Sequence, residues 1–548
     1  MAREISDGER FWGKWSAYDE RGIGLAVDWH QEIERGRTFA IISHPDAGKT
    51  TLTEKLLLFG GAIREAGAVK ARRAQAHARS DWMEIERQRG ISVTSTVLQF
   101  EYDGYRVNLL DTPGHQDFGE DTYRTLLAAD SAVMVIDAAK GVEAQTRKLY
   151  EVCRRRAMPI FTFVNKMDRE SKDPWELMAD IEQQLGLVPY PMNWPIGSGP
   201  GFQGLLHHHD KSFEVFERNT RTSRRADLQA AELDPDYRAQ LEESLELLNE
   251  AGEPWDAEAV TQGLLTPVFF GSAMANFGVE TFLKGFLAIG PAPMPRESVA
   301  GPVTPEHDQF AGFVFKIQAN MNPAHRDRVA FLRIVSGRFE RGMNVLHPRT
   351  GRTIRLNQPQ QFLAQERSIV ETAYPGDIIG LHDSGFFHIG DTLTTQPELE
   401  FVGFPRFVPE LFAEVELQYT LKHKQFQRGI KELTEEGLIQ RFTSADDGPE
   451  VYLGVVGPLQ FDVLSYRMKN EYGVDIALRT LPYTVVRWIV SGTAPQIGRF
   501  DRARLVLDGA GQRVLLVEDV RTLDRLVEKT PDLVVSEFPT GSRSASAS

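Results

Sequence analysis

The first residues suited to chemistry are a glycine, a lysine and a threonine in succession, near the end of the run Ser43-His44-Pro45-Asp46-Ala47-Gly48-Lys49-Thr50-Thr51. Residues 39–42 predict a buried strand before this run, and residues 51–58 predict a helix after it. Helix N-termini attract phosphate, so a nucleotide's phosphates would lie against this run. Lys49 would then reach the β- and γ-phosphates, and the Thr50 hydroxyl would bind Mg²⁺. Such loops usually begin with glycine rather than Ser43, but Gly48 beside the lysine is present. The run predicts a phosphate-binding loop.

A second motif, Asp111-Thr112-Pro113-Gly114, directly follows the predicted strand 107–110. An aspartate at the carboxyl end of a strand suits Mg²⁺, usually through a water, and Gly114 would let the backbone approach a γ-phosphate. His115 follows at once. A lone histidine is more often a surface or core residue, but beside a γ-phosphate it could orient an attacking water. His115 is therefore the predicted catalytic residue.

Two further motifs are suited to recognising a base. The first is Asn165-Lys166-Met167-Asp168, after the predicted strand 160–164, and the second is Gly271-Ser272-Ala273, after the predicted strand 267–270. Asp168 can accept N1–H and N2–H of guanine, a donor pair that adenine lacks. Asn165 would tie the base loop to the phosphate loop, and the Ala273 N–H could meet guanine O6. These motifs predict selection of GTP and GDP over adenine nucleotides.

Any one of the four motifs can arise by chance, and an ordinary turn is then the better interpretation. All four in order, each at the end of a predicted strand, leave that interpretation little room.

The stretch 80–94 lies between the first two motifs and predicts a switch segment that γ-phosphate and Mg²⁺ would order. Its Ser92 is the first candidate for a metal-ligating hydroxyl and Thr94 the second. Ile91 and Pro45 could form an apolar gate in front of His115.

The elements that must position these motifs are apolar strands alternating with helices between residues 38 and 187, with a last strand at 267–270. This alternation predicts an α/β domain, a mostly parallel sheet with helices on both faces, in which ligands bind at the carboxyl ends of the strands. Residues 31–298 are assigned to it. Around 190–262 the pattern loosens into Gly/Pro-rich turns and a charged helical run, residues 236–250, so this stretch is interpreted as an insertion.

Two more domains are predicted after a proline-rich linker. Residues 305–402 show short alternating runs broken by glycines, which predict a small β-barrel. Residues 405–535 mix strands, 412–417 and 451–456, with helices, 422–436 and 459–471, and predict an α+β domain. Residues 1–30 remain an unassigned extension, and the Ser/Ala-rich tail 536–548 predicts disorder.

The bulk composition limits the function classes. The net charge of −15 argues against indiscriminate DNA or RNA binding, although local basic groups such as Lys70, Arg72 and Arg73 leave room for docking on a ribonucleoprotein. Cys153 is the single cysteine, so a reducing cytoplasm is expected. We expect neither a membrane span nor a signal peptide. The adjacent residues 207–209 are all histidine, but they cannot all face one ion and are interpreted as a solvated loop.

At this point the motifs are similar to those of the translational GTPases, and most similar to the peptide chain release factor 3 family within them. The resemblance is carried by the phosphate loop from Thr38, by the phrase Ala76-His77-Ala78-Arg79-Ser80-Asp81-Trp82-Met83-Glu84, and by Asp111 to His115. It continues in residues 337–343 and 373–381, which resemble the family's second-domain barrel, and in 455–464, which resemble its third domain. Roughly nine-tenths of the chain is covered. Ser43 and Ser92 depart from the wider superfamily yet fit this branch.

The resemblance implies a cytoplasmic, monomeric factor that binds the ribosome with GTP, expels the codon-reading (class I) release factor indirectly, and then hydrolyses GTP with ribosomal stimulation. No membrane or DNA partner is implied. A translocase like elongation factor G, or a ribosome-protection factor, would need further domains, for which the residues after Arg479 are expected to be too few. A nucleotide-gated module without turnover is the alternative of a different class, and His115 argues against it.

Overall fold

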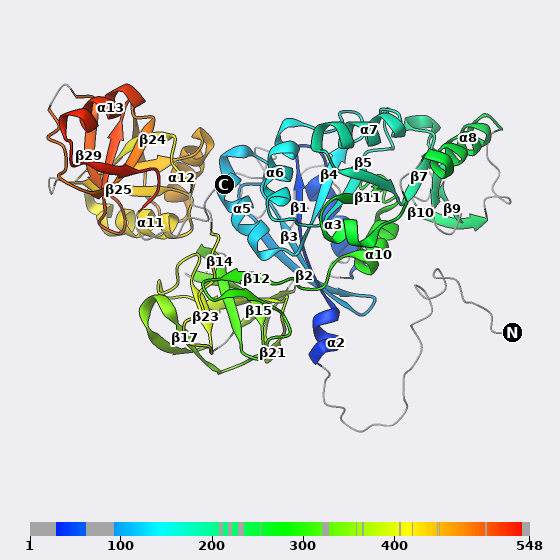
Figure 1. Ribbon diagram of the computed structural model, residues 1–548, viewed down its shortest axis with the longest axis horizontal. Helices are drawn as coiled ribbons and strands as arrows, with labels where there is room; N and C mark the ends of the chain where they lie inside the picture. The colour runs from blue at the N-terminus through cyan, green and yellow to red at the C-terminus, as the bar shows by residue number, and fades with distance from the viewer. Residues whose placement is uncertain are drawn as a thin grey trace.

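The computed structural model describes residues 29–61, 92–207, 212–217, 222–227, 235–251, 254–319, 328–357, 359–363, 366–404, 407–418, 420–445, 448, 450–498 and 501–539. Three groups of elements follow one another along the chain, coloured from blue through green to red (Figure 1). The first holds a mostly parallel sheet, the second a curled antiparallel sheet, and the third an antiparallel sheet with helices. The predicted fold class is confirmed, whereas the domain limits stay predictions.

The first sheet runs in the order β2-β3-β1-β4-β5-β11-β6. Every neighbouring pair in it is parallel except β2 with β3, which is antiparallel. The order places β1 beside both β3 and β4, so the segments that follow these three strands meet at one edge. The strands are β1 (Gly36–Ser43), β2 (Thr96–Tyr102), β3 (Tyr105–Asp111), β4 (Ser131–Asp137), β5 (Ile160–Asn165), β6 (Val188–Pro191) and β11 (Leu265–Phe270).

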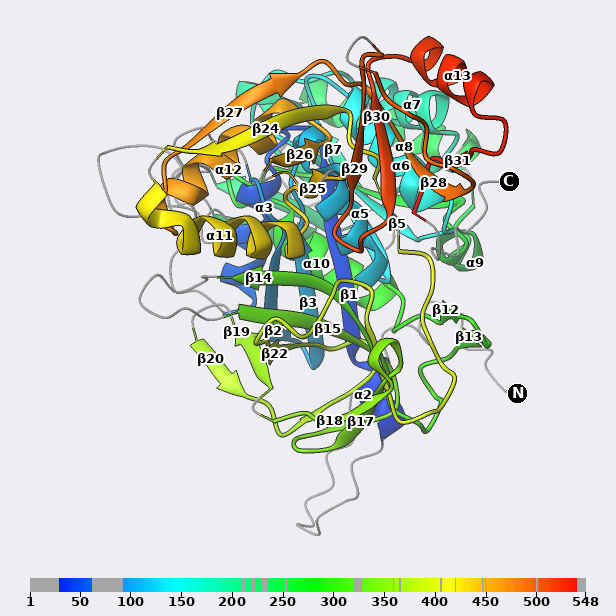
Figure 2. The same ribbon diagram turned by 90° about the vertical axis from the view of Figure 1, so that its left-hand side faces the viewer.

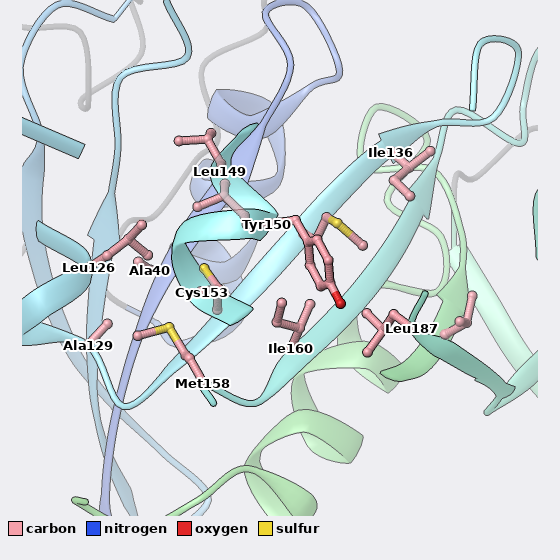
Figure 3. Close-up of a cluster of buried hydrophobic side chains, with 14 of the residues drawn as sticks. Ala40, Leu126, Ala129, Ile136, Leu149, Tyr150, Cys153, Met158, Ile160 and Leu187 are labelled. Carbon is pink, nitrogen blue, oxygen red and sulfur yellow. The ribbon is translucent and has the colours of Figure 1, made fainter. Parts of the chain in front are cut away.

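Helices cover both faces of this sheet because alternate residues of its buried strands point to opposite sides. In β1, Phe39 and Ile41 pack with α3 (Lys49–Phe59) and α10 (Val279–Ile289). Ala40 and Ile42 pack on the other side, in the cluster around Cys153 (Figure 3). That side carries the helices α5 (Gly119–Ala128), α6 (Ala144–Arg154) and α7 (Pro174–Leu185).

The insertion is more regular than the sequence predicted. It forms a four-stranded antiparallel sheet in the order β10-β9-β8-β7, followed by the predicted helical run. The elements are β7 (Asn193–Ile196), β8 (Gly204–His207), β9 (Ser212–Glu217), β10 (Thr222–Asp227), α8 (Pro235–Ala251) and α9 (Ala257–Thr261). The interpretation as loose turns was wrong for these strands. Strand β7 contains a proline and β10 is almost wholly polar, so neither carries a clear strand signal.

The second group of strands runs in the order β18-β17-β23-β14-β15-β22-β19 and joins the first sheet where Leu363 of β19 pairs with Gln99 of β2. A short pair, β12 (Arg296–Ser298) with β13 (Gly301–Val303), leads into it. Its strands are β14 (Ala311–Ala319), β15 (Arg328–Ser336), β17 (Asn344–His347), β18 (Arg352–Arg355), β19 (Gln360–Leu363), β20 (Glu366–Ile369), β22 (Ile378–His382) and β23 (Thr392–Thr394), with the separate pair β16 (Phe339–Glu340) and β21 (Thr372–Ala373).

The third group builds an eight-stranded sheet in the order β27-β24-β26-β25-β29-β30-β28-β31. The residues after Arg479 contribute four of these strands, so they complete the third domain. Its elements are β24 (Leu411–Leu417), α11 (His423–Glu435), β25 (Gln440–Ser444), β26 (Val451–Val455), α12 (Pro458–Asn470), β27 (Ile476–Leu481), β28 (Val485–Ser491), β29 (Ala503–Leu507), β30 (Arg513–Val517), α13 (Val520–Lys529) and β31 (Val534–Ser536).

Buried charges join the first domain to the second. Asp130 is almost fully buried, and its carboxylate accepts from Arg333 at 2.5 Å and from Arg296 at 2.8 Å. Burial lowers the pKa of Arg296 to about 10, while the Asp130 carboxylate opposes that shift, so the guanidinium is still charged at neutral pH. The Gly376 carbonyl of the second domain also accepts from Thr38 Oγ1 at 2.7 Å. These contacts hold the second domain against the base of the sheet.

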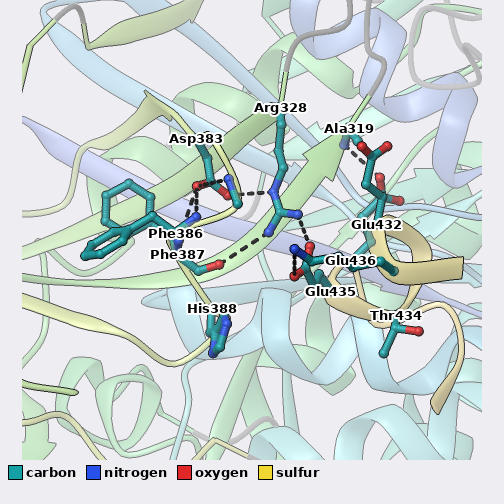
Figure 4. A network of polar contacts seen from close by, with 12 residues as sticks. Ala319, Arg328, Asp383, Phe386, Phe387, His388, Glu432, Thr434, Glu435 and Glu436 are labelled. Atoms are coloured by element: carbon teal, nitrogen blue, oxygen red, sulfur yellow. Dashed lines mark hydrogen bonds and ion pairs between the residues drawn. The ribbon is translucent and has the colours of Figure 1, made fainter. Parts of the chain in front are cut away.

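Arg328 of the second domain reaches the third (Figure 4). Its Nε lies 2.5 Å from Asp383 of its own domain, and its Nη1 donates to Glu435 of α11. Beside it, the Ala319 N–H donates to Glu436 at 2.7 Å. The third domain is therefore tied to the second at one end of α11, and Figure 2 shows α11 running directly above β14. Among the residues described, no helix combines the length and hydropathy that a membrane crossing requires.

Candidate nucleotide-binding site

The predicted phosphate loop lies between the end of β1, at Ser43, and the start of α3, at Lys49. Asp46 has φ 66° and Gly48 has φ 98°, so the loop turns through left-handed conformations before the helix. A side-chain carbon on Gly48 would overlap the Asn165 amide. Glycine is therefore required at 48 both by backbone conformation and by space. The first turn of α3, with half-buried Thr50 and Thr51, presents its free N–H groups toward the loop.

Lys49 and Asp111, predicted for phosphate and metal, come together at the carboxyl ends of β1 and β3. Lys49 Nζ lies 2.9 Å from Asp111 Oδ1 and also donates to the Thr112 carbonyl. Both side chains are buried. The second carboxylate oxygen, Asp111 Oδ2, is buried and has no hydrogen-bond partner among the described residues. An unsatisfied carboxylate oxygen next to a buried lysine fits a site built for a cation and phosphate.

The side chains predicted to bind Mg²⁺ all offer oxygen atoms. Asp111 supplies the orphaned carboxylate oxygen, and Thr50 and the buried Ser92 carry hydroxyls. These are the hard oxygen ligands that Mg²⁺ takes, and it keeps the rest of its shell as water and substrate phosphate. In the part of the chain that the structure describes, no group of three or more His, Cys, Asp or Glu side chains could hold a metal ion. The predicted ligands Asp111, Thr50 and Ser92 are thus oxygen donors of the kind that suits Mg²⁺ better than zinc.

The base-recognition motifs meet beside the phosphate loop. Asn165 Nδ2 donates to the Ala47 carbonyl at 2.9 Å, so the predicted tie between the loops is present in the structure. Asn165 Oδ1 accepts the Ala273 N–H at 2.9 Å. To donate to guanine O6, this N–H would have to form a bifurcated hydrogen bond or break its bond to Asn165. Ser272 Oγ donates to Asp168 Oδ1 at 2.6 Å and thereby orients that carboxylate. Met167 is fully buried beneath them.

Lys166 adds a contact that the sequence analysis missed. Its Nζ donates to the Asp46 carbonyl at 2.6 Å and pairs with Asp137 Oδ2 at 2.6 Å. Asp137 ends β4, the strand between β1 and β5, so its position at a strand terminus was the signal that could have identified it. The pair links the phosphate loop, the base loop and the end of β4 into one rigid rim.

His115 lies where the second motif turns away from the sheet. Gly114, just before it, approaches the phosphate loop, because a side-chain carbon there would lie 3.6 Å from Pro45 Cα. The His115 side chain is 35% exposed, and its Nδ1 accepts the Asp117 N–H at 3.2 Å. The ring is thus held at one nitrogen and is partly exposed. His44, in the loop itself, lies 3.5 Å from Glu143 through Nε2.

Several residues singled out in the sequence are not part of this site. Lys70, Arg72, Arg73, the phrase 76–84 and Ile91 lie outside the described residues, as do His208, His209 and residues 540–548 of the predicted tail. Ser536, the first residue of that tail, ends β31, so the prediction of disorder was wrong there. His207 ends β8, is buried, and lies 3.3 Å from Glu214, so the solvated-loop interpretation was wrong for it. The proposed roles of the site residues stay predictions.

Three family models match consecutive parts of the chain. They are described as Elongation factor Tu GTP binding domain, over residues 34–292, Elongation factor G domain 2, over 309–396, and Class II release factor RF3, C-terminal domain, over 401–526. The matches cover the same three groups of elements that the fold separates.

Curated relatives match over nearly their whole length. A peptide chain release factor 3 from Symbiobacterium thermophilum is 56% identical over 515 residues, covering 92% of this chain and 97% of that protein. Another, from a Cyanothece species, is 54% identical over 524 residues, covering 93% and 97%. Among solved structures, a protein from Thermus thermophilus is similar with a TM-score of 0.68 and 23% identity, covering 87% of this chain and 72% of that chain, which supports the fold.

Proposed function

The chain belongs to the peptide chain release factor 3 family of GTPases, and we propose that it uses GTP to promote dissociation of class I release factors from the ribosome after peptide release. The observation that carries the nucleotide chemistry is the convergence of Lys49, Asp111, Asn165 and Asp168 at one edge of the sheet. On this proposal the protein acts as a cytoplasmic monomer, with the ribosome as its direct partner.

Guanine recognition is assigned to the Asp168 carboxylate. Its Oδ1 already accepts from Ser272, and a carboxylate has about four lone-pair sites, so it can also accept N1–H and N2–H of the base. Adenine offers no such pair and would leave this carboxylate without its partners, a penalty typical of polar sites that reject an analogue. Asn165 and Lys166 hold the base loop and the phosphate loop at a fixed separation.

Phosphate binding is assigned to the loop 43–51. Lys49 would exchange its pair with Asp111 for the β- and γ-phosphates, while the N–H groups at the start of α3 face them. Mg²⁺, when bound, would offset the charge of the phosphates, and Thr50, Ser92 and Asp111 are the residues that would hold it. Thr112 Oγ1 donates to the Ile41 carbonyl at 2.6 Å and so fixes the motif that carries Asp111 against β1.

Hydrolysis is assigned to a water positioned by His115. The water oxygen forms a bond to the γ-phosphorus, the bond from that phosphorus to the bridging oxygen breaks, and the water protons pass to the phosphate and solvent. No arginine from the four motifs is placed to stabilise the developing charge, so turnover of the free protein should be slow and the ribosome would complete the site. GTP binding would order the switch segments and shift the population toward the ribosome-binding state.

The test uses ribosomes halted at a stop codon after peptide release, holding a fluorescent class I release factor. The intact protein with GTP should accelerate loss of the label, and Lys49→Ala should abolish that acceleration. Lys284→Ala removes a half-exposed lysine on α10 and is the matched control that should behave as the parent. Ribosome-stimulated hydrolysis without faster dissociation would reject the termination role and place the GTPase at another step of translation.

A second variant separates binding from turnover. His115→Ala should keep GTP affinity within about twofold, because the proposed role of His115 is to position the water rather than to hold the nucleotide. It should slow ribosome-stimulated hydrolysis at least about 100-fold, the scale of one lost catalytic group. Turnover at the parental rate would remove His115 from the mechanism.

A further inference from the structure

Asp117 has a buried carboxylate that two domains share. It lies two residues after His115, in the short 3-10 helix η1 (Gln116–Phe118), and is only 4% exposed. One oxygen, Oδ1, lies 3.3 Å from His115 Nδ1. The other, Oδ2, accepts the backbone N–H of Leu459 in the third domain at 2.8 Å. A buried carboxylate needs such partners, because without them its desolvation is costly.

The partner in the third domain is the N-terminus of helix α12, whose first N–H groups have no acceptors within the helix. Pro458 has no N–H, and the Gln460 side chain accepts from the N–H groups of Val456 at 2.8 Å and Gly457 at 3.1 Å. The Leu459 N–H therefore receives its acceptor from the first domain. A carboxylate at this position also interacts favourably with the positive end of the helix dipole. Asp117 acts as an N-cap supplied by another domain.

Gly457 makes the close approach possible. A side-chain carbon on it would overlap the Asp117 carboxylate. Its backbone, at φ −142° and ψ 158°, is extended, a conformation open to any residue. Glycine is thus required at 457 by the space that Asp117 occupies, and this requirement is separate from backbone conformation.

An apolar cluster surrounds the shared carboxylate. Val93 and Phe118 of the first domain pack with Leu459 and Val463 of α12, and all four are buried. Val93 follows Ser92, the predicted metal ligand, and Phe118 follows Asp117. The third domain therefore packs on both segments that flank the γ-phosphate side of the proposed site.

We propose that Asp117 is a positioning residue for His115, and that docking of α12 holds Asp117 in the orientation that places the histidine ring. In this structure, His115 Nδ1 accepts the Asp117 N–H at 3.2 Å and lies 3.3 Å from the Asp117 carboxylate, so the placement of Asp117 fixes that side of the ring. Withdrawal of α12 would leave the carboxylate without its cap and free to turn toward water. Hydrolysis thereby becomes dependent on the position of the third domain. This inference rests on the proposed role of His115.

The first experiment displaces Asp117 from the side of the third domain. Gly457→Ala should slow single-turnover GTP hydrolysis at least about tenfold, alone and with ribosomes, because small displacements of a catalytic group carry such costs. GTP affinity should stay within about twofold, since the three atoms nearest to a side-chain carbon at 457 all belong to Asp117, which is not a predicted nucleotide-binding residue. Gly509→Ala is the matched control, because a side chain there meets no atom within 4 Å and should leave hydrolysis unchanged. Parental hydrolysis in folded Gly457→Ala would overturn the inference.

The second experiment is a double-mutant cycle. Asp117→Ala should also slow hydrolysis with GTP affinity preserved, and adding Gly457→Ala to it should have no further effect, because the new methyl group then has no carboxylate to displace. Independent, multiplicative losses would mean that Gly457→Ala acts by a different route. Thermal unfolding checks that each variant is folded before its hydrolysis rate is compared. Asp117→Ala hydrolysing at the parental rate would also refute the proposal.

His115→Ala separates this inference from the function it rests on. Slow hydrolysis in His115→Ala together with parental hydrolysis in Gly457→Ala would refute the inference alone. Parental hydrolysis in His115→Ala would refute the proposed catalytic role itself.

Discussion

Asn165 offers the sharpest test of the nucleotide site, because one buried amide joins three segments. Its Nδ2 donates to the Ala47 carbonyl of the phosphate loop, and its Oδ1 accepts the N–H groups of Ala273 and Lys166, each at 2.9 Å. Asn165→Ala removes all three bonds and leaves the fully buried Ala273 without an acceptor for its N–H. We expect the phosphate loop and the base loops to lose their fixed separation.

The magnitude follows from those bonds. Each contributes about 1 kcal/mol net, and an orphaned buried N–H adds about 1 kcal/mol, so the arrangement loses about 2–4 kcal/mol. Bound GTP requires the loops in register, so this cost should appear as weaker binding, roughly 30- to 700-fold in Kd at 1.4 kcal/mol per factor of ten. Isothermal titration with GDP and with a non-hydrolysable GTP analogue measures it directly.

Asn108→Ala is the matched control. Asn108 is also a buried asparagine of the same sheet, accepting from Gln99 at 2.6 Å and donating to Thr38 at 3.2 Å, but it faces the second domain. It should cost comparable folding stability and leave nucleotide affinity within about twofold. An Asn165→Ala variant that binds within threefold of the parent, or an Asn108→Ala variant that binds as poorly, would refute the assignment.

Two further predictions concern the scaffold. Asp130→Asn leaves Arg296 and Arg333 buried without their carboxylate, so the free energy of unfolding in urea should fall by about 3–5 kcal/mol. The control Asp308→Asn changes an exposed residue and should have little effect. A loss below about 1 kcal/mol for Asp130→Asn would contradict the role of these buried ion pairs. Burial raises the pKa of the Cys153 thiol to about 12, above its ordinary value of 9.0, so the folded state favours the thiol and stability should be lost as pH rises from about 9 toward 12. Iodoacetamide at pH 8 should label Cys153 only after unfolding, and rapid labelling of the native protein would contradict that burial.

The sequence predicted the nucleotide site well because its signals are local. Strands β1, β3 and β5 are largely apolar, as strands buried on both faces tend to be, and the predicted strands 39–42, 107–110 and 160–164 lie within them. The motifs follow these strands directly. In a parallel sheet the carboxyl ends lie at one edge, so order along the chain was enough to bring Lys49 and Asp111 together.

The insertion was harder because its strands have no strong pattern. Strand β7 reads Asn-Trp-Pro-Ile and β10 reads Thr-Ser-Arg-Arg-Ala-Asp, so neither shows the apolar alternation that identifies a half-buried strand. The first contains a proline, which argues against a central strand, and β7 indeed lies at the end of the sheet order. Here, pairing with neighbouring strands overrides the weak strand propensity of each segment. A short stretch of sequence does not contain the information about that pairing.

Contacts between domains lay beyond sequence reasoning altogether. Asp117 and Gly457 each carry an ordinary local interpretation, the first as a residue of a turn after His115 and the second as a glycine before a helix-starting proline. Only their approach gives both residues a further role, since the carboxylate fills the space where a side chain at 457 would lie and accepts an N–H from a residue 342 positions away. No periodicity or spacing can encode such a pair, because it depends on how whole domains dock. The same docking puts α12 against the residue after Ser92 and the residue after Asp117, so a change at the γ-phosphate would reach the third domain through direct packing.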